Sequence, residues 1–342
     1  MKKIIKYFIL LLFTFVIFGL TSCDNKGLKK VRVAEVAHSV FYAPQYVALE
    51  MGYFEDEGLD VELINSNGAD KVTAALLSKD VQIGLQGPEP TIYLYNSDQK
   101  NYLINFAQLT RTDGSFIFGR EPIDNFTLDM LKGKSILGGR KGGVPEMTLE
   151  YALKQAGLKV VRDGEEVDKD TVNVRTDVAF GAMAGSFIAG EGDFTTLFEP
   201  TATEVVNSNK AFLLCSVGEI VGEVPYTAYS TTINYFNNNK DVLEKFTKAI
   251  YRAVLLINES TDEEIAKIML KQFPDSNVES LTEVVKRYRS INAWSNDLYF
   301  TEDGFNRLMD IMDEAGELDK RADYNKIVNN EIVEKVVYGF KK

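Results

Sequence analysis

Apolar and polar positions change their spacing along the first part of the chain. The segment 59–64, Leu-Asp-Val-Glu-Leu-Ile, alternates at period two and predicts a strand, whereas residues 69–78 have the spacing of an amphipathic helix. Similar reasoning gives strands at 31–36, 59–64 and 81–85, and helices at 43–51 and 69–78. This order of strand, helix, strand, helix and strand predicts a mostly parallel sheet covered by helices.

A second run of the same kind begins after Asp113 and Gly114. Strands are expected at 134–137, 172–174, 195–198 and 211–215, and helices at 145–156, near 179–189 and at 200–207. We interpret 226–232 as a crossing back, after which helices are expected near 241–257, 263–272, 279–289 and 303–314. Capping boxes are expected at Thr261-x-x-Glu264 and Ser276-x-x-Glu279.

The N-terminus has the pattern of an export signal. Three lysines precede an apolar run, residues 7–20, that is shorter than the roughly 20 residues needed to span a bilayer. We therefore expect a signal peptide at 1–22, with a membrane anchor as the weaker alternative. The segment 20–23, Leu-Thr-Ser-Cys, resembles the lipobox of bacterial lipoproteins. The resemblance implies that Cys23 is lipidated and that residues 23–30 tether the protein to the outer face of the bacterial cytoplasmic membrane.

The remaining chain is too long for one simple core. We expect an α/β fold in which lobe 1 is discontinuous, made of residues 31–113 and 228–342. Lobe 2, residues 114–227, is inserted between two crossings. Ligands of open α/β sheets bind beyond the carboxyl ends of the strands, so a site is expected in the cleft between the lobes.

Composition excludes several classes of partner and chemistry. The formal charge of −12 disfavours nucleic acid and anionic lipid as partners. The chain has two cysteines, and with Cys23 lipidated no internal disulfide is expected. The second, Cys215, has the flanks of a buried strand, where a thiol behaves as a small hydrophobe. A single histidine, His38, excludes a His-rich metal cluster, and we expect neither a metal nor a cofactor.

Several segments match a family pattern. Residues 46–62, YVALEMGYFEDEGLDVE, with further similarity at 83–90, 131–143 and 198–200, resemble the substrate-binding proteins of ABC importers. The resemblance is to the group that serves nitrate, alkylsulfonates, taurine and pyrimidine thiamine precursors. It implies a two-lobed, type II periplasmic-binding-protein-like fold without enzymatic activity. It also implies a monomer that captures a small molecule by hinge closure and delivers it to an ABC transporter permease.

Four loops are expected to converge on the cleft. The predicted ligand-binding residues are His38, Ser39, Phe41, Tyr42, Gln86, Gly87, Glu89, Gly142, Gly143, Val144, Glu199 and Tyr226. Aromatic rings can stack on a planar ligand, and the glycine-rich turn 138–143 leads into a helix with free amides. Structural roles stay open as alternatives: packing for the aromatic residues and for Trp294, helix capping for Glu89, and a structural histidine at position 38.

Aromatic faces, an amide-rich turn and two carboxylates favour a planar heterocycle with N–H donors, such as a pyrimidine or related vitamin precursor. A sulfonate, taurine or nitrate is the alternative ligand. Two other classes of protein stay open: an extracellular sensor domain, and an enzyme resembling the pyrimidine synthases that share this fold. The cysteine-rich motif of those synthases is absent from this sequence.

Overall fold

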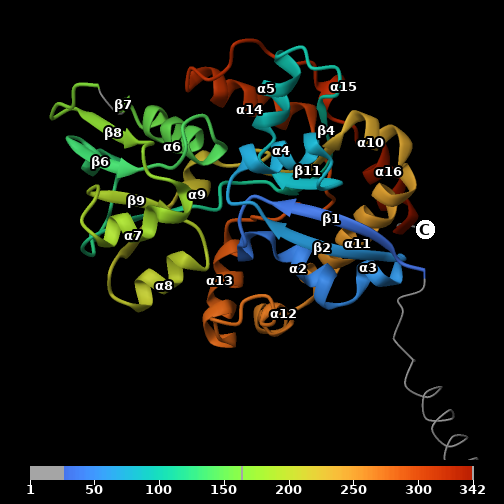
Figure 1. The fold of residues 1–342 in the computed structure, drawn as a ribbon. Coiled ribbons are helices and arrows are strands. Elements are labelled where there is room, and N and C mark those ends of the chain that lie inside the picture. The colour runs from blue at the N-terminus through green and yellow to red at the C-terminus, as the bar shows by residue number, and fades with distance from the viewer. Residues whose placement is uncertain (1–26, 163–164, 341–342) are drawn as a thin grey trace, which may run out of the picture.

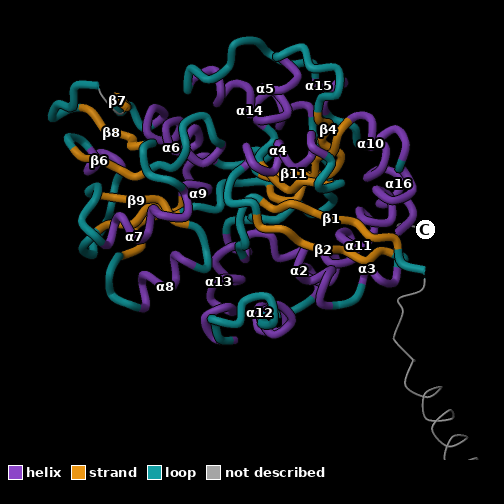
Figure 2. Tube along the Cα trace, viewed as in Figure 1, coloured by secondary structure: helices purple, strands orange, loops and turns teal. Residues whose placement is uncertain are grey.

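The computed structural model describes residues 27–162 and 165–340, whose strands form two sheets, one in each half of the molecule (Figure 1). The strand orders are β2-β1-β3-β11-β4 and β10-β5-β9-β6-β8-β7. Figure 2 shows these strands as two separate groups joined by loops. The predicted signal peptide and the lipidation site Cys23 lie outside the described residues.

The first sheet has five strands. They are β1 (Lys29–Glu35), β2 (Leu59–Asn65), β3 (Ile83–Gln86), β4 (Leu103–Thr110) and β11 (Thr227–Thr232). Strand β1 pairs parallel with β2 and β3, whereas β11 pairs antiparallel with β3 and β4. The pattern of the sequence predicts no strand at β4, because all eight of its residues are buried and apolar alternation is lost.

Helices cover both faces of the first sheet. Those of the N-terminal part are α2 (Ala43–Glu50), α3 (Tyr53–Asp56), α4 (Ala69–Ser78) and α5 (Glu89–Asn96). In Figure 1, α4 and α5 lie above the sheet, and α2 and α3 lie below it. Gly52 has a φ of 70° and lets the chain turn from α2 into α3, where Phe54 stacks on Phe246 with centroids 5.1 Å apart.

The C-terminal part is helical, as the pattern predicts. Its helices are α10 (Ile233–Asn238), α11 (Lys240–Glu259), α12 (Asp262–Met269), α13 (Val278–Ser290), α14 (Glu302–Glu314), α15 (Tyr324–Ile327) and α16 (Glu331–Phe340). The capping box of Thr261 and Glu264 is confirmed. The box predicted at Ser276 is wrong, because Asn277 caps α13 by accepting a hydrogen bond from Ser280 N at 2.8 Å.

The second sheet is mixed. Its strands are β5 (Phe116–Gly119), β6 (Lys134–Leu137), β7 (Lys159–Arg162), β8 (Thr171–Arg175), β9 (Phe194–Leu197) and β10 (Phe212–Ser216). Its helices are α6 (Val144–Gln155), α7 (Met183–Ile188), α8 (Thr201–Asn207) and α9 (Val217–Val221). Strand β6 pairs parallel with β8 and β9, whereas β5 pairs antiparallel with β9 and β10.

Two crossings join the sheets, residues 111–115 after β4 and residues 222–226 before β11. They lie side by side, since Val224 N donates a hydrogen bond to Arg111 O at 2.9 Å. The lobe boundaries given above stay a prediction. Within 27–162 and 165–340, no helix combines the length and apolar character that a membrane crossing needs.

Candidate functional site

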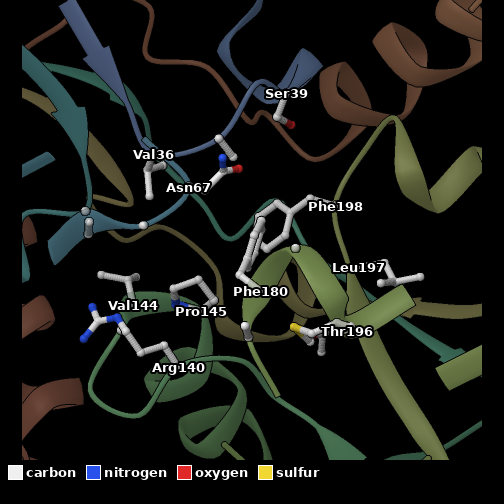
Figure 3. A pocket seen from close by; sticks show the side chains of 18 of the residues that line it. Val36, Ser39, Asn67, Arg140, Val144, Pro145, Phe180, Thr196, Leu197 and Phe198 are labelled. Carbon is white, nitrogen blue, oxygen red and sulfur yellow. The ribbon is translucent and has the colours of Figure 1, made fainter. Parts of the chain in front are cut away.

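A cavity of about 500 Å³ lies between the two sheets. Its walls come from the loops that follow β1, β2 and β3 of the first sheet and β6, β8 and β9 of the second. Figure 3 shows side chains from both halves facing this space, among them Val36 and Asn67 opposite Pro145 and Phe180. The carboxyl ends of strands from both sheets therefore meet at one cavity, as expected for a ligand site in this class of fold.

Most of the predicted ligand residues line this cavity. They are His38, Ser39, Tyr42, Gly87, Glu89, Gly143, Val144, Glu199 and Tyr226. Phe41, Gln86 and Gly142 lie beside the cavity without lining it. Ligand contact by any of them stays a prediction, but the structure brings the four loops together.

Phe41 is a core residue in this structure. It is 1% exposed, and its ring lies 5.1 Å from Tyr288, 5.6 Å from Tyr226 and 5.9 Å from Phe198. The indole of Trp294 donates a hydrogen bond from Nε1 to Phe41 O at 3.0 Å. Trp294 is thus a packing residue, in line with the structural alternative. Phe41 packs behind two residues that line the cavity, Tyr226 and Phe198.

Gln86 and Gly142 are engaged in local hydrogen bonds. The side chain of Gln86 accepts from Thr73 Oγ1 at 3.1 Å and donates to Ser230 Oγ at 3.2 Å. Gly142 N donates to Glu146 Oε2 at 3.0 Å, and Gly142 O accepts from Tyr93 Oη at 3.0 Å. Both residues position their loops at the rim of the cavity.

His38 has both ring nitrogens occupied. Nδ1 lies 2.8 Å from Glu35 Oε1, and Nε2 lies 2.8 Å from Gln272 O. Because both partners are acceptors, a doubly protonated imidazolium satisfies both contacts. Burial lowers the pKa of His38, but the bonds to Glu35 and Gln272 outweigh it and leave the pKa above its ordinary value. Neither ring nitrogen of His38 is therefore left unpaired.

Glu199 is a buried carboxylate with its charge compensated. Oε2 accepts from Thr203 N at 2.8 Å, and Oε1 forms an ion pair with Arg287 of α13. No local pattern in the sequence points to Arg287, because α13 lies nearly 90 positions further along the chain. The backbone of this loop also contacts the loop after β1 of the first sheet, since Ser39 Oγ donates a hydrogen bond to Glu199 O at 2.5 Å.

Glu89 is a second buried carboxylate, and unlike Glu199 it has one oxygen without a hydrogen-bond partner among the described residues. Its side chain is 2% exposed, and Oε1 lies 3.4 Å from Arg140 Nη2. Oε2 has no hydrogen-bond partner within the described part of the chain. Burial raises the pKa of Glu89 to about 7, although Arg140 and the backbone N–H groups of Glu89 and Val144 act in the opposite direction.

Two phenylalanine rings form the apolar wall of the cavity. Phe180 and Phe198 lie 5.5 Å apart between ring centroids, and both labelled side chains project into the space in Figure 3. Phe180 is 39% exposed. Neither ring is among the predicted ligand residues, although each follows the end of a strand where ligand residues are expected.

The structure also places the groups that could hold a metal or act as a nucleophile. Within residues 27–162 and 165–340, no three His, Cys, Asp or Glu side chains are placed to hold a metal ion. Cys215 lies on β10 as predicted, but it is half-buried rather than buried. Burial raises the pKa of its thiol to about 12, so the thiolate needed for nucleophilic chemistry is scarce.

Comparison with known proteins gives close and distant matches. The family model described as NMT1/THI5 like matches residues 40–264. A putative binding protein of Bacillus subtilis (strain 168), YtlA, is 39% identical over 323 residues, 94% of each chain.

Solved structures match at lower identity. The ligand-binding component of an ABC-type import system from Staphylococcus aureus has a TM-score of 0.70 at 12% identity, over 90% of this chain and 99% of that one. The alkanesulfonate-binding protein SsuA from Xanthomonas axonopodis pv. citri has a TM-score of 0.68 at 15% identity, over 88% and 98%. These matches confirm the predicted fold class, an α/β periplasmic-binding-protein fold of type II with two mixed sheets.

Proposed function

The chain belongs to the NMT1/THI5-like family, and on that premise we propose that it is the solute-binding component of an ABC import system. The cavity between the two sheets carries this proposal, because it is built from strand ends of both halves and has a volume suited to a small molecule. The relative YtlA, named as a binding protein, agrees with it. The proposed activity is reversible binding of a small molecule, without a chemical reaction on it.

Closure of the two lobes about the crossings is the proposed mechanism. Lobe 1 would comprise 31–113 and 228–342, and lobe 2 would comprise 114–227. Contacts across the cavity support it. Ser39 Oγ bonds to Glu199 O at 2.5 Å at one edge, and Tyr93 Oη bonds to Gly142 O at 3.0 Å at another. A ligand held between them would be enclosed on both sides and released when the lobes part.

The proposed ligand is a planar heterocycle that carries N–H donors, a pyrimidine or related vitamin precursor. Three features of the cavity support it: the rings of Phe180 and Phe198, the ring of Tyr42, and the buried carboxyl of Glu89. Aromatic faces suit a flat ring, and a carboxylate accepts hydrogen bonds from its amino group.

An oxyanion is the second candidate ligand. Arg140 lines the cavity and is 44% exposed, and α6 begins at Val144 with backbone amides directed toward its N-terminal end. Both features suit a sulfonate, taurine or nitrate. The solved structure of an alkanesulfonate-binding protein has the same fold. We rank this candidate second because Glu89 would lie beside the anion.

Thermal unfolding with and without ligands tests both candidates. The protein prepared without residues 1–23 would be heated with 4-amino-5-hydroxymethyl-2-methylpyrimidine, taurine, ethanesulfonate or nitrate. A ligand at 100 times its Kd stabilises the folded state by about 2.7 kcal/mol. A rise with the pyrimidine supports the favoured ligand. A rise only with sulfonates overturns that choice and leaves solute capture intact.

Lipid anchoring at Cys23 is the proposed localisation, at the outer face of the bacterial cytoplasmic membrane beside a permease. The acyl chains would be attached at Cys23, the first residue of the tether 23–30 and six positions before β1 begins at Lys29. Fractionation of cells that produce the wild type or Cys23→Ser tests it. We expect the wild type with the membranes and the variant released. Equal distribution of the two would contradict the anchor.

Two other classes of function are weaker. An enzyme like the pyrimidine synthases would need a reacting group, and the sequence lacks the cysteine-rich motif of those proteins. A sensor domain would bind the same ligand and report it to a receptor. Cross-linking of the anchored protein in membranes separates the two roles, since an importer subunit gives adducts with a permease.

A further inference from the structure

Glu89 holds an unused acceptor at the wall of the cavity. It is the first residue of α5, its side chain is 2% exposed, and it is part of the cavity lining. Oε2 is buried without a hydrogen-bond partner among the residues that the structure describes. An unpaired buried carboxylate oxygen is costly, so such an atom in a cavity is suited to a ligand donor.

Two other buried carboxylates near the cavity, Glu35 and Glu199, have both oxygens occupied. Glu35 pairs Oε1 with His38, and its Oε2 accepts from Gln45 Nε2 and Tyr46 Oη, all at 2.8 Å. Glu199 pairs Oε2 with Thr203 N and Oε1 with Arg287. These two carboxylates therefore have structural partners already, whereas Glu89 retains capacity to accept.

The position of the Glu89 carboxyl depends on a glycine. A Cβ at residue 87 would lie 2.0 Å from Glu89 Oε2 and 3.0 Å from Val144 Cγ2. Gly87 therefore leaves the space in which the carboxyl stands at the cavity wall. The facing cation, Arg140, is 44% exposed, and its Nη2 is 3.4 Å from Oε1, at the long limit of a hydrogen bond.

We infer that Glu89 is the specificity-determining residue of this cavity: its Oε2 accepts a hydrogen bond from an N–H donor of the ligand, and its charge disfavours oxyanions. The inference rests on the proposed solute-binding function and adds a named selecting atom to it. A charge-assisted hydrogen bond from the amino group of an aminopyrimidine to this carboxylate strengthens binding of that ligand. Placing an anion beside the same carboxylate costs affinity by like-charge repulsion.

Isothermal titration of wild type and Glu89→Gln with two probes at pH 8, where Glu89 is ionised, tests this inference. The probes are 4-amino-5-hydroxymethyl-2-methylpyrimidine and ethanesulfonate. Glutamine keeps the shape of the side chain but removes the charge and offers an N–H donor. We expect aminopyrimidine binding to weaken about 10- to 100-fold in the variant, as for loss of a charged hydrogen bond. Ethanesulfonate binding is expected to strengthen.

A matched control and a reciprocal variant accompany this measurement. Glu302→Gln removes an exposed glutamate that is likewise the first residue of a helix, α14, and it should bind both probes as the wild type does. Arg140→Gln removes the facing cation from the half-exposed rim. Arg140→Gln should weaken ethanesulfonate binding and leave aminopyrimidine binding equal or stronger. This variant keeps the inference testable even if Glu89→Gln folds poorly.

The possible outcomes distinguish failure of the inference about Glu89 from failure of the proposed ligand class. If the wild type binds aminopyrimidine and Glu89→Gln binds it within twofold, the inference is overturned and the proposed ligand stands. If the wild type binds only ethanesulfonate and the variant binds it more tightly, the proposed ligand and the hydrogen bond to Oε2 both fall, and only the repulsion of oxyanions by Glu89 stands. Ethanesulfonate binding that the variant leaves unchanged overturns both, as does absence of binding of either probe.

Discussion

Arg287 on α13 forms an ion pair with the buried Glu199, in the loop that follows β9. The arginine belongs to the C-terminal helices beside the first sheet, and the glutamate belongs to the second sheet. Arg287 also donates to Thr203 Oγ1 at 3.2 Å. The pair is therefore one of the contacts that hold the two halves around the cavity.

Replacing Arg287 by glutamine should destabilise the protein by about 3 kcal/mol, because Glu199 would be left buried without a counter-charge. Urea unfolding measures the loss. The double variant Arg287→Gln with Glu199→Gln should recover much of it, since no uncompensated charge then remains. Equal loss in the single and double variants would show that packing of Arg287, rather than charge, is responsible.

His38 should make stability depend on pH. Its folded-state pKa is raised above 6.5 by Glu35 and Gln272, against burial, which lowers it. The stability that this pair contributes is fully present below pH 6.5 and is lost as the pH rises through the folded-state pKa. The difference in Tm between the wild type and His38→Gln should therefore be larger at pH 6 than at pH 9. A difference that is constant over this range would contradict an ionised pair.

Glu89 should give a pH dependence in the ligand-free protein. Burial raises its pKa from 4.5 to about 7, so the folded state is favoured by protonated Glu89 below pH 4.5 and loses this stability as the pH rises through 7. At pH 8 the shift corresponds to about 3 kcal/mol. Glu89→Gln should therefore be more stable than the wild type at pH 8 and nearly equal to it at pH 4. Denaturant unfolding at both pH values measures this.

Many elements of both sheets could be predicted from the sequence, because their faces differ in burial, but the pattern predicts none of the strands β4, β5 and β7. Strand β2 alternates between buried and exposed residues, and α11 has one apolar face. Strand β4 could not be predicted, since it is buried on both faces and shows no period. The start of α13 was misplaced by one residue because Ser276 and Asn277 are both good caps, and local propensity does not decide between them.

The sequence predicts which loops form the candidate site, but not which side chains in them have partners. Strand ends place His38, Glu89 and Glu199 at the cavity, which follows from the topology of an α/β sheet. Which carboxylate is free depends on partners that are remote in sequence. Arg287 occupies Glu199, whereas Arg140 only approaches Glu89. Such pairings arise from packing of distant elements and leave no local pattern.

Gly87→Ala should impair binding while leaving the fold intact. The added Cβ would lie 2.0 Å from Glu89 Oε2, the end of a flexible side chain that can move away. Displacement of this oxygen should weaken aminopyrimidine binding about 10-fold, as for loss of one charged hydrogen bond. Gly185→Ala on α7 is the control, since its Cβ has no neighbour within 4 Å among the described residues. Equal affinity of the two variants would show that the carboxyl position is unimportant.

Glu317 should control how tightly the two halves close. It lies after α14, and its Oε1 is 3.2 Å from Arg162 Nη1 and 3.5 Å from Lys141 Nζ, both from the second-sheet half. Lys154 Nζ adds a bond to Glu314 O at 2.6 Å. Glu317→Ala removes two of these contacts, so the ligand-free protein should populate a more open form.

Small-angle scattering would detect that opening as a larger radius of gyration for Glu317→Ala than for the wild type without ligand. With saturating ligand the two should become equal, because binding energy favours the closed form. The apparent Kd should rise in proportion to the loss of closed molecules before binding. Glu331→Ala, which breaks an ion pair with Lys240 2.7 Å away within the first-sheet half, is the control and should not change the radius. Identical radii for the ligand-free wild type and Glu317→Ala would exclude this contact as a determinant of closure.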